Sequence, residues 1–135
     1  MPYLTIDHNA DIGHPVEYFT DREIELDCRG PLHISPLSNW GLYITVLTAS
    51  HDPGNFSDVI YRPVVVEAGA WICSSAILYN CTIGENAVVA LGCVVRSRDV
   101  PAETMVEGNP ARIIARLING KWKYLDYPIP LGRKK

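Results

Sequence analysis

The sequence predicts an all-β fold of the parallel β-helix type, and two observations support this class. Aliphatic residues recur at every sixth position, and a small residue usually stands two positions before each of them. Side chains two residues apart in a strand point to the same face, so each such pair describes a short strand with one buried face. The large positions are Ile6, Ile12, Tyr18, Ile24, Leu42, Val66, Ile72 and Leu78, and, after a slip of one residue, Ile83, Val89 and Val95.

The positions two residues earlier follow the same period, although Arg22 is an exception among them. Two cysteines thereby become small core residues. These positions are Leu4, Ala10, Val16, Trp40, Val64, Ala70 and Ala76 before the slip, and Cys81, Ala87 and Cys93 after it.

A six-residue step leaves no room for an amphipathic helix, and turn formers such as Gly84 and Asn86 follow Ile83. Three short strands joined by tight corners close a triangle of about 18 residues, and stacked triangles pair their backbones at roughly 4.8 Å per coil. We therefore expect about four to five coils over residues 1–114, with a loop near residues 52–63. A β-sandwich also has many short strands, but it would not hold one phase from Ile6 to Leu78.

The register is weakest between Ile24 and Val66. In this stretch Gly30, Pro36 and Thr48 occupy positions where the period calls for an aliphatic residue. His33 stands 18 residues before His51, which is one coil, so the two rings are expected at one corner of adjacent coils.

The composition argues against several classes of function. At 135 residues we expect one domain, and the formal charge of −3 with a pI near 5.7 gives no general basic field for nucleic acid. The last three residues, Arg133 to Lys135, form a small basic tail. No run of 18 apolar residues and no apolar signal core occurs, so neither membrane insertion nor secretion is expected and we predict a cytoplasmic protein.

The four cysteines, Cys28, Cys73, Cys81 and Cys93, contain no CxxC pair and no histidine at zinc-finger spacing. They indicate neither a structural metal site nor a disulfide framework. Reduced, unreactive thiols are expected at the inward positions 81 and 93.

The segment "TASHDPGNF", residues 48–56, places His51 between an apolar run and a Pro/Gly/Asn stretch. A histidine at such a junction is often just a solvated loop residue. It is also suited to general-base catalysis, because a neutral imidazole accepts the proton of an attacking hydroxyl.

The chain resembles the hexapeptide-repeat acyltransferases, and specifically their sugar O-acetyltransferase branch, which includes the maltose, galactoside, nodulation-factor and exopolysaccharide enzymes. The resemblance implies a left-handed parallel β-helix, acetyl coenzyme A as cosubstrate, His51 as the general base, and an active site between the subunits of a homotrimer. The matching stretches are "SHDP" at 50–53, "AWI" at 70–72, "TIGENAVVALGCVV" at 82–95, "RDVP" at 98–101 and "EGNPARII" at 107–114.

The resemblance also implies a cofactor-binding set. Trp71 matches the tryptophan near the thioester, Arg112 and Arg98 match basic residues associated with the cofactor, and Ala90 and Gly92 stand where the pantetheine arm would pass the coils. Four of these residues have a structural alternative: Trp71 at a subunit interface, Arg112 on solvated surface, and Ala90 and Gly92 as repeat residues. The usual "WIG" reads "WIC" at 71–73.

Polar residues of the loops are candidates for binding the acceptor, among them Asn39 and Asp52. A sugar nucleotide or polysaccharide precursor is favoured over maltose or galactoside, because the N-terminal helical segment typical of those enzymes is absent from this sequence. An amine or antibiotic acceptor is a further alternative.

Two other classes remain open. A catalytically silent β-helix would serve as an assembly scaffold. A zinc-dependent carbonic anhydrase branch shares the fold, but zinc catalysis needs three protein ligands, and His8 and His14 lie at least one coil further from His33 and His51. No metal site is therefore predicted.

Residues 115–135 are expected to leave the coils as a C-terminal tail. We expect a short helical turn ending near Asn119 and Gly120, with the tail aromatics packed on the prism or on a neighbour.

Overall fold

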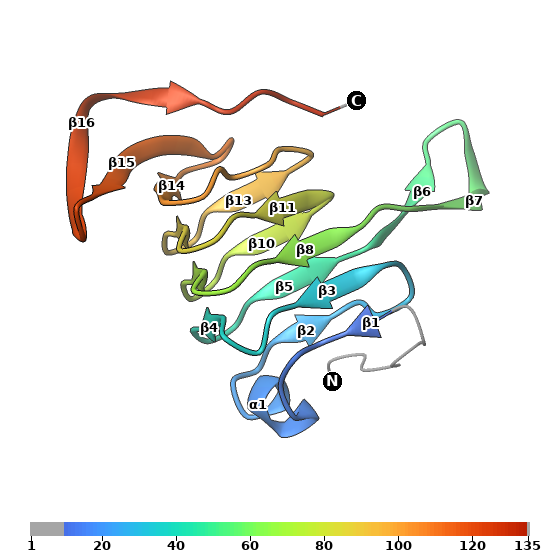
Figure 1. Ribbon diagram of the computed structural model, residues 1–135. Coiled ribbons are helices and arrows are strands. Elements are labelled where there is room, and N and C mark those ends of the chain that lie inside the picture. Colours follow the sequence, from blue (N-terminus) through green and yellow to red (C-terminus); the bar gives the residue numbers. More distant parts are fainter. Residues whose placement is uncertain (1–9, 135) are drawn as a thin grey trace.

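The computed structural model describes residues 10–134 and shows a triangular parallel β-helix (Figure 1). Three sheets form its walls, and the chain visits them in turn, so that strands from successive coils pair in parallel. The first sheet holds β1 (Ala10–Asp11), β3 (Leu32–Ile34), β8 (Val64–Val66) and β11 (Cys81–Ile83). The second holds β2 (Glu25–Leu26), β5 (Thr45–Leu47), β10 (Ile77–Tyr79) and β13 (Val94–Arg96).

The third sheet is the longest. It contains β4 (Asn39–Trp40), β9 (Trp71–Ile72), β12 (Val88–Val89) and β14 (Thr104–Glu107), and it continues into β15 (Arg112–Ile118) and β16 (Lys121–Pro130). The first four strands pair in parallel, whereas β15 and β16 are antiparallel additions. The predicted fold class, a parallel β-helix, is confirmed.

The core is a column of inward side chains that alternate with exposed ones. In β8, Val64 and Val66 are fully buried while Val65 between them is not. From Val64 onward the predicted inward positions are confirmed, because each is at most 1% exposed. They are Val64, Val66, Ala70, Ile72, Ala76, Leu78, Cys81, Ile83, Ala87, Val89, Cys93 and Val95.

The predicted register is wrong between Ile24 and Val66. Leu42, placed inward by the period, is 47% exposed at a corner, while Trp40, placed at a small position, occupies a large one and is 5% exposed. A hairpin of β6 (Ala49–Asp52) and β7 (Asn55–Tyr61) is inserted between Val46 and Val66 and shifts the phase by two residues. The inward residues of this coil are Leu32, Ile34, Ser38, Trp40, Ile44 and Val46.

The same phase shift separates His33 from His51. His33 lies on the first sheet in register with Val65, and its Nδ1 is 3.5 Å from Asp11 Oδ2. His51 lies on the inserted hairpin, paired with Val59. The expected stacking of the two rings at one corner is therefore wrong.

A short helix stands where the period predicted a strand. Helix α1 (Val16–Thr20) begins after Pro15, and it buries Phe19 completely. Phe19 meets the Trp40 ring edge-on at 5.4 Å between centroids, and the backbone N–H of Trp40 donates to the Tyr18 hydroxyl at 3.2 Å. Val16 and Tyr18, predicted as inward strand residues, pack only at the margin of the core. The helix closes the N-terminal end of the prism, whereas Leu4, Ile6 and His8 lie outside the described residues.

The tail is a β-hairpin and not a helical turn. Asn119 and Gly120 join β15 to β16 with φ of 51° and 75°. Two central residues with positive φ are the signature of a type I′ hairpin turn, for which Asn-Gly is the favoured pair. β15 spans Arg112–Ile118, with a register shift against both β14 and β16 around Ile114, and the tail thus extends the third sheet.

The tail aromatics differ in their contacts. Trp122 is half-buried, the Tyr124 hydroxyl lies 3.8 Å from Met105 Sδ, and Tyr127 is 82% exposed. After β16 the chain returns over the last coil, where the Lys134 N–H donates to the Ser97 carbonyl at 2.6 Å. The two ends of the prism are thus closed by different devices, α1 at one and the chain terminus at the other (Figure 1).

One polar contact ties the first two coils together beside the inserted hairpin. Asp27 Oδ2 accepts the Thr48 N–H at 3.2 Å, and the Asp27 carbonyl accepts the Thr48 hydroxyl at 2.8 Å. Arg29 Nε donates to Asp27 Oδ1 at 2.8 Å. Burial alone would raise the pKa of Asp27, but the hydrogen bonds from Arg29 and Thr48 outweigh it and lower that pKa.

None of the helices formed within residues 10–134 has the length and apolar character needed to cross a membrane; α1 has five residues.

Cys81 and Cys93 should react slowly with thiol reagents in the native protein. Both are free and at most 1% exposed, and burial raises the pKa of each thiol to about 12, so the reactive thiolate is scarce at neutral pH. Labelling with an aromatic disulfide reagent, followed by mass spectrometry, should modify them only after denaturation. Rapid native labelling of both would contradict the inward register.

Asp27→Asn should reduce stability more at neutral than at acidic pH. The pKa of Asp27 is lower in the folded protein than its ordinary value of 3.8. Its carboxylate therefore stabilises the fold at pH values above 3.8, and this effect is lost as the pH falls through the folded-state pKa. The gap in the free energy of unfolding between wild type and variant should shrink between about pH 6 and about pH 2 in urea titrations. A gap independent of pH would contradict this role.

Candidate active site

His51 lies in the middle of β6, on the hairpin that projects from the prism between β5 and β8 (Figure 1). The hairpin pairs His51 with Val59 across the two strands. The imidazole is exposed, and its Nδ1 lies 2.8 Å from the carbonyl oxygen of Phe56. The ring is therefore anchored at one nitrogen and open to solvent around the other.

This anchor determines the tautomer of the neutral ring. A carbonyl oxygen only accepts hydrogen bonds, so Nδ1 must carry the proton and donate it to Phe56. The lone pair of a neutral imidazole then lies on Nε2, which points away from the anchor. The arrangement supplies a fixed proton acceptor, as general-base chemistry requires.

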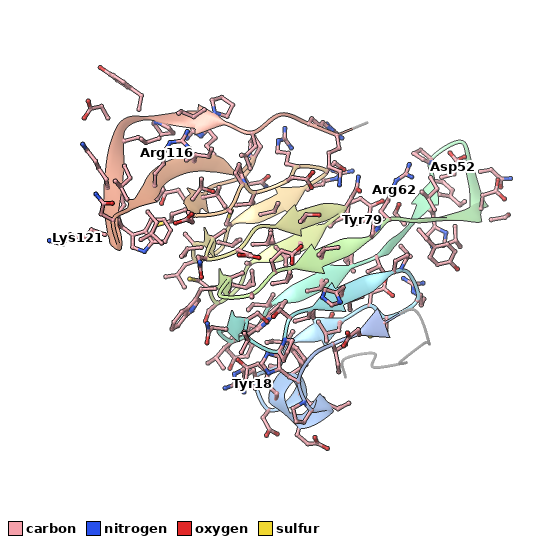
Figure 2. All side chains as sticks on the ribbon, viewed as in Figure 1. Tyr18, Asp52, Arg62, Tyr79, Arg116 and Lys121 are labelled. Atoms are coloured by element: carbon pink, nitrogen blue, oxygen red, sulfur yellow. The ribbon has the colours of Figure 1, made fainter. Side chains whose placement is uncertain are left out.

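The sequence of the hairpin explains its shape. Asp52 Oδ1 accepts the Gly54 N–H at 2.8 Å, and Asn55 Oδ1 accepts the Ser57 N–H at 3.2 Å, so two side chains fold the tip onto itself. Asp52, predicted as an acceptor-binding residue, thus uses one oxygen in the turn. Figure 2 shows it on the projecting hairpin.

The root of the hairpin is held by a pair of hydroxyls. Ser50 Oγ and Tyr79 Oη lie 2.8 Å apart, which joins β6 to β10 of the second sheet. Figure 2 places Tyr79 and Arg62 at this root. Neither Tyr79 nor the Phe56 carbonyl has a signal in the sequence, because a backbone acceptor is independent of residue type and Tyr79 lies outside the matched motifs.

The predicted cofactor residues and the predicted acceptor residue Asn39 lie in three places. Arg98 lies on the same side of the prism as the hairpin, where its Nη1 donates to the Arg96 carbonyl at 3.1 Å and its backbone pairs with Arg133. Asn39 and Trp71 lie on the third sheet, in register with each other, and Trp71 is 52% exposed.

The other three predicted residues gather near the corner between the third and second sheets. Ala90 and Gly92 turn the chain between β12 and β13; Gly92 has a φ of 66°, and a Cβ there would meet nothing within 4 Å. The Val94 N–H donates to the Gly108 carbonyl at 3.0 Å, which brings the turn before Arg112 to the same corner. Arg112 itself is exposed at the start of β15.

The structure does not bring these groups together within one chain. The hairpin leaves the corner shared by the second and first sheets, which in a triangular prism is the corner opposite the third sheet. His51 and Trp71 are therefore on different sides of the molecule.

Other histidines have structural contacts. His14 stacks on Tyr18 at 4.1 Å between ring centroids, and burial is the main cause that lowers its pKa. Within residues 10–134, no three His, Cys, Asp or Glu side chains are grouped so as to hold a metal ion.

No family model matches this sequence. Among curated proteins it is similar to the 2,3,4,5-tetrahydropyridine-2,6-dicarboxylate N-acetyltransferase of Staphylococcus aureus (strain bovine RF122 / ET3-1), with 43% identity over 53 residues, which is 38% of this chain and 22% of that protein.

Solved structures match over more of the chain. A hexapeptide-repeat acetyltransferase of Vibrio cholerae O1 biovar eltor, complexed with acetyl coenzyme A, is 30% identical with a TM-score of 0.63, covering 72% of this chain and 55% of the other. A maltose O-acetyltransferase of Clostridium difficile 630 is 28% identical with a TM-score of 0.65, covering 71% and 54%.

A galactoside acetyltransferase in complex with coenzyme A shares the fold, at 21% identity and a TM-score of 0.60, covering 79% of this chain and 56% of that one. This chain spans 54–56% of the length of these three neighbours. Its fold is a parallel β-helix with a six-residue repeat, and the proteins it resembles in fold and sequence are acetyltransferases.

Proposed function

We propose that this protein is an acetyl coenzyme A-dependent O-acetyltransferase, with His51 as general base and a sugar, sugar nucleotide or polysaccharide precursor as acceptor. The observation that carries the proposal is the 2.8 Å contact from His51 Nδ1 to the Phe56 carbonyl, which leaves Nε2 as a fixed proton acceptor. The sugar acetyltransferase among the structural neighbours supports the acceptor class.

The proposed reaction is a direct transfer. Nε2 of His51 takes the proton of the acceptor hydroxyl while the hydroxyl oxygen attacks the thioester carbonyl carbon. The tetrahedral intermediate collapses with cleavage of the carbon–sulfur bond, and the imidazolium returns the proton to the departing thiolate. General-base assistance of this kind is typically worth ~10²–10⁴ in rate, and no acyl-enzyme is required.

The residues present suit acetyl coenzyme A. The open, side-chain-free surface at Gly92 and the small Ala90 leave room for a pantetheine arm, and exposed Arg112 stands near the same corner for the phosphates. Trp71 offers an apolar surface on the adjoining sheet. The Vibrio neighbour, solved with acetyl coenzyme A, supports this assignment.

The separation of His51 from Trp71 supports a shared active site. We propose a homotrimer in which the hairpin of one subunit meets the third sheet and the following corner of the next. A closed ring of heterologous contacts satisfies this geometry. Large apolar side chains on both surfaces are exposed in the single chain: Phe56 is 73%, Trp71 52% and Leu91 74% exposed.

The proposal also assigns roles to the other predicted residues and includes a location and two alternative functions. Asn39 and Asp52 are candidates for binding acceptor hydroxyls, and Arg98 for binding the cosubstrate from the hairpin side.

A cytoplasmic location fits the free cysteines. An amine acceptor is the second candidate, because the curated relative is an N-acetyltransferase. A silent scaffold is the alternative if no acceptor is acetylated.

His51→Ala should lower the rate of acetyl transfer at least ~10²-fold while acetyl coenzyme A still binds. Coenzyme A release, measured against a panel of sugars, sugar nucleotides and amines, gives the rate and identifies the acceptor.

His33→Ala is the matched control, because His33 is exposed on the first sheet away from the hairpin. It should retain wild-type turnover. Near-normal turnover of the His51 variant would reject His51 as the base, and loss of activity in the His33 variant would point to that residue instead.

The protein should behave as a trimer at micromolar concentration in multi-angle light scattering. Because each site is proposed to use two subunits, His51→Ala and Arg112→Glu chains that are inactive alone should regain activity when co-expressed, to roughly a quarter of wild type for random mixing in a ring. A monomer, or a trimer without any complementation, would reject the shared site.

A further inference from the structure

Charge is distributed very unequally along the chain. From Arg112 to Lys135 the sequence holds seven of its 12 Lys and Arg residues but only one of its 15 Asp and Glu residues, Asp126. The preceding 111 residues hold the other five basic and 14 acidic residues. A weakly acidic protein thus carries a strongly basic C-terminal hairpin, and the reaction proposed above does not require most of these cations.

The hairpin gathers three of these cations on one face. Arg116 pairs directly with Lys123, and Ile118 pairs with Lys121, so these four side chains share one face of the β15–β16 ribbon. All four are exposed. The opposite face carries Leu117 and Trp122, which are half-buried. We call Arg116, Lys121 and Lys123 the cationic face; Figure 2 shows Arg116 and Lys121 on this hairpin.

The cationic face has an unbalanced charge. Like charges directly opposite in an antiparallel pair are destabilising, yet Arg116 and Lys123 stand opposite each other. Among the salt bridges and side-chain hydrogen bonds formed within residues 10–134, none involves Arg116, Lys121 or Lys123. Lysines on an exposed edge strand also guard against unwanted strand pairing, which accounts for Lys121 and Lys123. It does not account for Arg116, because β15 lies between β14 and β16.

We propose that the cationic face binds an anionic glycan, a polymer whose sugars carry carboxylates, and so retains the polymeric form of the acceptor. The proposal rests on the acceptor being a glycan, as inferred above. Arg116 suits bidentate pairing with one carboxylate, while Lys121 and Lys123 add point charges for neighbouring sugars. The acidic remainder of the chain repels the same polymer, so the attraction is confined to this hairpin.

The chemistry of the face favours a glycan over a nucleic acid. Binding of single-stranded nucleic acid combines cations with aromatic rings on which the bases stack. The fourth residue of this face is Ile118, and Trp122 is turned to the opposite face. The cationic face therefore offers charge without a stacking surface.

The place of the hairpin fits retention of a polymer. β15 and β16 extend the third sheet, which in the proposed trimer receives the His51 hairpin of the next subunit. A polymer bound at the cationic face by one part would therefore reach that shared site with another part. Small acceptors would gain nothing from it.

Binding is tested with the full-length protein and three probes: fluorescently labelled polygalacturonate, neutral dextran of similar length, and a single-stranded DNA oligonucleotide. We expect polygalacturonate to bind more tightly than the other two, with an affinity that falls as salt is raised. Arg116→Gln/Lys123→Gln should weaken it roughly tenfold at low ionic strength. Thermal unfolding confirms that the variants fold.

Arg62→Gln and Arg116→Gln form the matched pair of controls. Each removes one exposed guanidinium, but Arg62 lies at the root of the other hairpin. Only the Arg116 variant should lose polygalacturonate affinity. Equal loss in both would show an effect of net charge, and tighter binding of the oligonucleotide would show a nucleic-acid surface; either result overturns the proposal.

Kinetic measurements distinguish glycan binding at the cationic face from binding of acetyl coenzyme A, and they test it independently of the proposed acetyl transfer. The double variant should raise KM for a polymeric acceptor and leave KM for acetyl coenzyme A unchanged; a raised KM for acetyl coenzyme A would assign these cations to its phosphates and overturn the proposal. Polygalacturonate binding by a protein that transfers no acetyl group would reject the proposed function alone. Transfer to a monosaccharide without polymer binding would reject the cationic face alone.

Discussion

The stacking of identical coil positions on one another is the constraint on which the rest of the structure depends. Within the prism, inward side chains stack on equivalent residues of the neighbouring coils, as Leu78 does between Val46 and Val95, and the backbones pair strand by strand. A residue that breaks the period must therefore leave the prism or lie at its end. The two features with chemical interest, the His51 hairpin and the C-terminal hairpin, are such departures.

The His51 hairpin shows how a rigid scaffold positions a loop. Its root is joined to the second sheet by the Ser50–Tyr79 contact, and the preceding residue, Thr48, is held by Asp27 of the coil below. The tip is folded by its own Asp and Asn side chains. The imidazole consequently has one nitrogen committed to a backbone carbonyl and the other free, which a mobile surface histidine would lack.

The two ends of the prism cover their inward side chains with different segments. A coil at either end exposes inward side chains on one side. At the N-terminal end, Phe19 of α1 fills this space against Trp40. At the C-terminal end, the chain folds back so that Leu131 joins the core and Lys134 pairs with Asp99 at 3.2 Å. Only the C-terminal segment carries an excess of positive charge, so the hairpin of β15 and β16 differs in charge from the rest of the surface.

The sequence by itself determined the fold class and the core from Val64 to Val95, because a six-residue period is a local pattern that survives wherever the coils follow one another without interruption. It also pointed to His51 as a candidate base. Only the tertiary structure decided the register before the inserted hairpin, since an insertion outside the repeat changes the phase without any mark in the periodic positions. Tertiary packing also bears on Val16–Thr20, which is a helix whose Phe19 is buried against Trp40. The turn at Asn119–Gly120, where a helix end was expected, follows instead from the local preference of Asn-Gly for a type I′ hairpin. The contact of His51 with the Phe56 carbonyl and the shared face of Arg116 and Lys123 depend on the pairing register of each hairpin. Only the folded strands decide that register, because a slip of one residue would turn these side chains to the other face.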